Sequence, residues 1–119
     1  MKGDSGSTWA PPPRPEVRSL ALHKIIAEKL RADPSLLRQA ISTLNRWKSA
    51  DGTESADRLE WRELLQGPVD GILAILVDPG PRGIRLRNAS PFTGVLTNEE
   101  RMRIIKAWRA GELTALIRD

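Results

Sequence analysis

Apolar residues recur at intervals of three and four over the first part of the chain, which is the spacing of an amphipathic α-helix. This pattern predicts a first helix over residues 16–32, with apolar positions at Val17, Leu20, Ala21, Leu22, Ile25, Ile26 and Leu30. Asp33 and Pro34 follow as a helix N-cap and a proline at the first helical position, so one helix ends and the next begins within a very short turn. The second helix carries the apolar stripe Leu36, Leu37, Ala40, Ile41, Leu44 and Trp47. Two helices joined so closely are expected to pack as a hairpin or a sharp corner.

The middle of the chain predicts two shorter helices. A polar loop at 51–55 precedes a short helix closed by Gly67, with apolar positions at Leu59, Trp61, Leu64 and Leu65. Residues 69–77 are apolar nearly all round, and the flanking Pro68 and Asp78-Pro79 favour a buried central helix over a strand. Residues 79–83 interrupt the pattern, and the alternation of apolar and basic residues over 84–88 predicts a short helix or a turn.

Residues 90–105 join an apolar loop to a clear helix start. Thr97 and Glu100 form a T-x-x-E capping box, which predicts a helix from Asn98 that ends at Gly111. Its expected apolar face consists of Met102, Ile105 and Trp108, with Ile104 beside them, and a last turn or two would bury Leu113, Leu116 and Ile117. The preceding loop holds Phe92, Val95 and Leu96. These three side chains are too apolar to be solvated, so they either fill the core or form a partner-binding site.

These elements predict an all-α fold, in which a compact bundle of about five or six short helices follows a disordered, proline-rich tail. We expect the tail to cover residues 1–15 and a single helical domain to cover residues 16–119. The chain has no apolar run of the roughly 20 residues that span a bilayer, and its start lacks the apolar stretch of a signal peptide. A cytoplasmic protein that contacts no membrane is therefore expected. The absence of cysteine excludes disulfides, thiol catalysis and cysteine-bound zinc.

The net charge of +4 is concentrated near the C-terminal end, where residues 79–119 carry 8 Lys or Arg against 4 Asp or Glu. The simpler interpretation is a solvated basic surface. The alternative is a site for anions or nucleic acid, whose candidate residues are Arg82, Arg85, Arg87, Arg101, Arg103 and Lys106.

The residues that could carry catalysis are few. His23 is the only histidine and lies next to the apolar stripe of the first helix, which is more typical of a partly buried or surface residue than of a general base. Asp57, Glu60 and Glu63 share one predicted helix, where carboxylates usually form a solvated face. Glu99 and Glu100 are explained by the positive end of the helix dipole. We therefore expect no enzyme activity, no cofactor and no metal.

Three tryptophans, Trp47, Trp61 and Trp108, each belong to a different predicted helix. They are expected to supply core volume, and the alternative is that one of them joins Phe92 as an interface anchor. A DNA-binding regulator is a further alternative, because the Asp33-Pro34 turn suits a helix-turn-helix. The second helix offers Arg38, Gln39, Asn45, Arg46 and Lys48 to DNA, and the last helix offers Arg101, Arg103, Lys106 and Arg109.

Several stretches carry a family resemblance: residues 18–34, residues 45–47, residues 61–65, and the Ser-Pro-Phe-Thr-Gly-Val-Leu stretch at 90–96 with Glu100 and Arg101. Together they resemble a family of small all-helical proteins of high-GC bacteria. Members of this family look like antitoxins, or antitoxin-like accessory proteins, of two-gene toxin systems. The chain departs from the family at Gly80, Pro81 and Gly83, where a regular helix with a run of arginines is expected.

The resemblance implies that the protein covers the active site of a toxin-like enzyme and also binds promoter DNA. Phe92, Val95 and Leu96 would then be the apolar anchor. DNA phosphates or an acidic cleft of the toxin would then be bound by six basic residues, which are Arg82, Arg85, Arg87, Arg101, Arg103 and Lys106. A second copy of the chain is another candidate partner.

Overall fold

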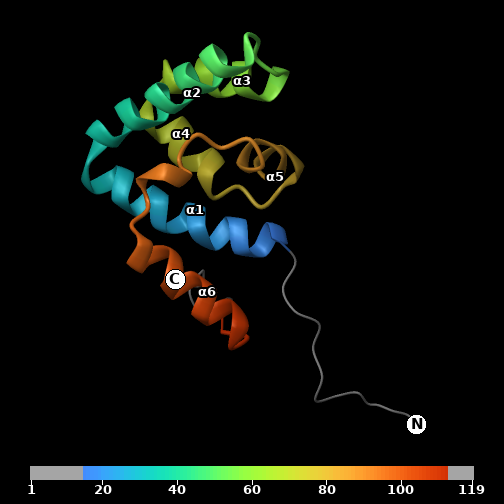
Figure 1. Cartoon of the computed structure of the whole chain (residues 1–119). Helices are drawn as coiled ribbons and strands as arrows, with labels where there is room; N and C mark the ends of the chain where they lie inside the picture. Colours follow the sequence, from blue (N-terminus) through green and yellow to red (C-terminus); the bar gives the residue numbers. More distant parts are fainter. Residues whose placement is uncertain (1–14, 113–119) are drawn as a thin grey trace.

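The computed structural model of the chain describes residues 15–112, which fold into helices and contain no strand. The elements are α1 (Pro15–Ala32), the 3₁₀ turn η1 (Pro34–Leu36), α2 (Leu37–Asp51), α3 (Ala56–Leu65), α4 (Val69–Leu76), α5 (Pro81–Arg87), the 3₁₀ turn η2 (Thr93–Val95) and α6 (Asn98–Arg109). The prediction of a compact all-α fold is confirmed (Figure 1). The predicted tail, apart from Pro15, and the expected last turn at 113–118 lie outside the described residues.

The turn between α1 and α2 forms where the sequence predicts it. The Asp33 side chain accepts a hydrogen bond from the backbone N–H of Ser35 at 3.2 Å, and Pro34 occupies the first position of η1. Beyond the turn the two helices diverge into a sharp corner (Figure 1). The main contacts of α1 are with α4, α5 and α6, whereas those of α2 are with α3 and η2. Because η2 contacts both α1 and α2, the 90–96 segment fills the angle between them.

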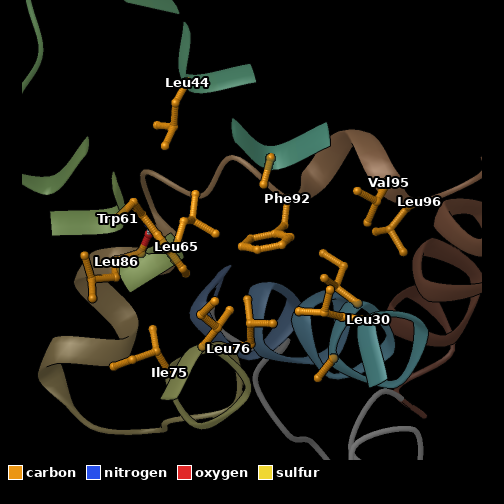
Figure 2. Close-up of a cluster of buried hydrophobic side chains, with 14 residues drawn as sticks. Leu30, Leu44, Trp61, Leu65, Ile75, Leu76, Leu86, Phe92, Val95 and Leu96 are labelled. Carbon is orange, nitrogen blue, oxygen red and sulfur yellow. Dashed lines mark hydrogen bonds between the residues drawn. The ribbon is translucent and has the colours of Figure 1, made fainter. Parts of the chain in front are cut away.

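The core collects apolar side chains from every helix before α6. Trp61 is fully buried, and its indole N–H donates to the Leu86 carbonyl at 2.7 Å, so the one polar atom of the ring is satisfied inside the core. The Phe92 ring meets Trp61 edge to face, with 5.6 Å between ring centroids. Figure 2 shows Phe92 among side chains that include Trp61, Leu65, Leu30 and Leu76.

The α5 segment is helical, and its one glycine, Gly83, allows a close packing contact. A Cβ atom on Gly83 would lie 2.1 Å from the carbonyl oxygen of Asp78, which is far inside van der Waals contact. Pro81 occupies an early position of the helix, where its missing N–H leaves no hydrogen bond unmade. The residues Gly80, Pro81 and Gly83 are therefore compatible with a helix at this point of the chain.

Helix α6 begins and ends where predicted but is rotated relative to the expectation. Both hydrogen bonds of the capping box between Thr97 and Glu100 are present, and Gly111 adopts the left-handed conformation with φ of 73°. Ile104 is the buried residue of α6 and packs on Ala21 of α1. Met102 is 48% exposed, so the prediction that it shares the buried face is wrong.

Candidate functional site

Phe92, Val95 and Leu96 lie in the core and do not form an exposed anchor. Phe92 is 0% exposed, and the other two side chains are 7% exposed. The η2 turn directs them into the cluster of buried apolar side chains (Figure 2). The buried Ser90 hydroxyl accepts a hydrogen bond from the backbone N–H of Phe92 at 3.1 Å. Of the two interpretations of this loop, the structure supports the one in which it fills the core. The assignment of these residues as a partner-binding surface is corrected accordingly.

Arg82 and Arg85 are engaged by carboxylates of α3. Arg82 Nε donates to Glu60 at 2.8 Å, while Arg85 pairs with Glu60 at 3.0 Å and also with Asp57. These hydrogen bonds, first that of Arg82 and then that of Arg85, hold the pKa of Glu60 below its usual value. The packing of α5 against α3 thus pairs two of the predicted anion-binding arginines with acidic residues.

Arg87 is buried, with 4% of its surface exposed, and caps the C-terminal end of α4. Its Nη1 atom donates to the carbonyl of Asp78 at 2.6 Å and lies 3.4 Å from the carbonyls of Ile75 and Leu76. Burial lowers the pKa of the guanidinium. The expectation that Arg87 belongs to a surface for anions is corrected, because the side chain is buried and its Nη1 atom donates to a backbone carbonyl near a helix terminus.

His23 is enclosed in the structure, with 1% of its surface exposed. Its Nδ1–H donates to the Ser19 carbonyl at 2.7 Å, and burial lowers the pKa of the imidazole to about 4. The ring is therefore neutral near neutral pH. A substrate in solution has no access to the ring in this conformation. The sequence predicted a partly buried or surface histidine, and the structure buries it fully.

The last three predicted basic residues lie on α6 and differ in their contacts. Arg101 donates to the carbonyl of Thr93, which ties α6 to η2. Arg103 and Lys106 are exposed and make no hydrogen bond or ion pair with any residue in the described range 15–112. Met102, Arg103, Lys106 and Arg109 together form an exposed surface, the α6 outer face.

The start of α6 is fixed to α1 by a polar contact. Lys29 donates to the Val95 carbonyl at 2.6 Å and to Glu100 at 2.9 Å. The Thr97 backbone N–H and then Lys29 hold the pKa of Glu100 below its usual value. Further along, α6 packs on α1 through Ile104 and the partly buried Trp108. The helix is thus held at its first turn and along one side, while its outer face is exposed.

A groove along α2 contains basic residues that the charge count passed over and that the sequence offered only in the helix-turn-helix alternative. Its sides are α2 and the 91–95 loop, and its volume is about 340 Å³. The α2 groove, as we call it, is lined on the α2 side by Arg38, Gln39, Ser42, Thr43 and Arg46. The sequence signal was the absence of acidic residues in α2 before Asp51, the last residue of the helix.

The tryptophans divide between the core and its edge. Trp61 is in the core as expected, whereas Trp47 and Trp108 are partly exposed and are each covered by an arginine. Arg58 lies 4.8 Å from the centre of the Trp47 ring, and Arg18 lies 4.9 Å from that of Trp108. These cation–π contacts cover the exposed ring faces with side chains of the chain itself.

No known protein family, no curated protein and no solved structure matches this chain. Within residues 15–112, no group of three or more histidine, aspartate or glutamate side chains is placed to hold a metal ion. No helix in the same range is long and apolar enough to cross a membrane. The fold and its surfaces define the class only as an all-α helical protein.

Proposed function

We propose that the chain is a non-enzymatic binding module that docks onto an acidic surface of a partner protein through the α6 outer face. In this role it is an antitoxin-like member of a bacterial two-gene system and regulates or neutralises a toxin-like enzyme. The observation that carries the proposal is the composition of the α6 outer face. Met102 is an exposed apolar side chain flanked by the cations of Arg103, Lys106 and Arg109.

This combination suits an acidic partner on physical grounds. A desolvated apolar side chain at the centre of a contact contributes much of its affinity, and methionine adapts to irregular partner surfaces. Surrounding cations accelerate encounter with a carboxylate-rich surface and disfavour basic partners. Met102 thus takes the anchor role that the sequence suggested for Phe92.

The attachment of α6 also supports a binding role. Ile104 is the one residue of α6 that is fully buried, in a small cluster with Ala21. Together with Trp108 and the hydrogen bonds of Lys29, this cluster holds α6 on α1, so the exposed outer face of the helix is presented to a partner on a fixed support.

The test uses the product of the neighbouring gene as the candidate partner. Co-purification and calorimetry should detect a complex with the wild-type chain, and Lys106→Glu should weaken it by about tenfold, or about 1.4 kcal/mol. Met102→Ala should weaken it by a similar or larger factor, because an anchor residue contributes about 1 kcal/mol or more.

Arg38→Glu is the matched control, since it makes the same charge change as Lys106→Glu on a different helix. We expect it to leave the affinity for the protein partner unchanged. The proposed surface would be refuted if neither Lys106→Glu nor Met102→Ala weakened the complex. It would also be refuted if Arg38→Glu weakened the complex as much as Lys106→Glu does. Circular dichroism of each variant confirms that the helical fold is retained.

A further inference from the structure

The exposed side of α2 carries a regular row of polar and basic residues. Arg38, Ser42 and Arg46 recur at every fourth position, so they lie on one face of the helix, and all three are exposed. Gln39 and Thr43 are adjacent to this row, and with it they form the α2 side of the α2 groove. Residues 37–50 also include Lys48 and no acidic residue.

The arginines of the α2 groove differ from most others in the structure. Arg62, Arg82 and Arg85 are paired with carboxylates. Arg38 and Arg46 make no hydrogen bond or ion pair with any other residue of the described part of the chain, and no carboxylate lines the groove. Two guanidinium groups therefore retain their donors for an external anion.

We propose that the α2 groove binds the phosphate backbone of a nucleic acid. Arginine guanidinium groups bind phosphate with two parallel hydrogen bonds, and hydroxyl and amide side chains such as Ser42, Thr43 and Gln39 are common further donors to phosphate and sugar. The axial rise from Arg38 to Arg46 is about 12 Å. Measured along the axis of a duplex, where each nucleotide of one strand rises by about 3.4 Å, that distance corresponds to about three to four nucleotides.

The groove favours a nucleic acid over an acidic protein. Its α2 side is polar throughout, and the apolar residues on its other side, Pro91 and Val95, are themselves buried. No exposed apolar side chain lines the groove as the anchor that a protein contact requires, since Ile41, which is exposed on the same helix, lies outside the groove lining. The inference also goes beyond the proposed protein contact, because α2 and α6 lie on opposite sides of α1 (Figure 1).

The experiment measures binding of the full chain to a short fluorescent DNA duplex of arbitrary sequence by anisotropy, between about 50 and about 200 mM salt. The wild type should bind, with log Kobs falling linearly against log salt. The double variant Arg38→Ala/Arg46→Ala should bind more weakly and with a slope smaller by about 1.8, because each lost phosphate contact removes about 0.9. Circular dichroism should show an unchanged fold.

The matched control is Arg103→Ala/Lys106→Ala, which removes the same charge from α6 and should leave the salt slope unchanged. Equal losses in the two double variants would show an effect of net charge alone and overturn the proposal. Absence of binding at the lowest salt would also overturn it. Polyglutamate that displaces the duplex at equal charge concentration would overturn the nucleic-acid assignment in favour of an acidic protein surface. Each result is independent of the complex with the neighbouring gene product, which the α6 variants test.

Discussion

Replacing Phe92 by alanine should severely destabilise the protein. The ring is 0% exposed and packs edge to face on Trp61, with 5.6 Å between centroids. Truncation of a buried phenylalanine costs about 3–5 kcal/mol, from lost transfer free energy and from the cavity left behind. The fully enclosed site favours the middle of that range, about 4 kcal/mol. Since small domains have about 5–15 kcal/mol of stability in total, this loss is a large fraction of it.

Urea denaturation followed by circular dichroism measures the effect. With a slope of about 1.5 kcal/mol per molar urea, a loss of about 4 kcal/mol lowers the midpoint by about 2–3 M. Met102→Ala is the control, because this side chain is 48% exposed and its truncation should change stability by less than about 0.5 kcal/mol. A Phe92→Ala variant that loses less than about 1 kcal/mol would refute the assignment of the ring to the core.

Two further substitutions test the packing and electrostatics of the core. Gly83→Ala should destabilise the protein by about 1–3 kcal/mol or more, because the new Cβ would lie 2.1 Å from the Asp78 carbonyl oxygen. Gly71→Ala in α4 is the control, because no atom lies within 4 Å of its Cβ. It should stabilise the protein by about 0.4–1 kcal/mol in the same urea titration. If both variants lose stability equally, the close approach at Gly83 is not the cause. The pKa of His23 is lowered from 6.5 to about 4 on folding, so the unfolded chain binds more protons between these two pH values. Stability therefore falls as pH falls through this window, by up to about 3 kcal/mol. Urea midpoints measured from pH 7 to 4.5 should show this slope, and His23→Leu should flatten it; an equal slope in the variant would show that other groups cause the dependence.

The helix boundaries could be predicted because cap chemistry is local. Asp33 with Pro34, and Thr97 with Glu100, specify helix starts through contacts that span at most three residues. The rotation of α6 could not be obtained in the same way. Ile104 and Met102 each fit an apolar stripe, and the packing of Ile104 on Ala21 of α1, a contact between distant parts of the chain, decides which residue is buried.

The candidate surfaces could not be fully predicted either, because they also depend on contacts between distant parts of the chain. A charge count assigned Arg82, Arg85 and Arg87 to one basic surface, but α5 packs beside α3, and its arginines meet carboxylates and helix carbonyls. The same count passed over Arg38 and Arg46, which lie in a mildly acidic part of the sequence and entered only as DNA-facing residues of the helix-turn-helix alternative. They line a groove because the 91–95 loop packs beside α2, a contact that no local pattern encodes.

We expect the partner to contact the α6 outer face while the 90–96 segment stays in the core. Amide hydrogen exchange, measured on the chain alone and in complex with the neighbouring gene product, tests both expectations together. In the complex, exchange should become slower along residues 102–109 and stay unchanged over residues 90–96. Slower exchange confined to the 90–96 segment, with α6 unaffected, would contradict both expectations.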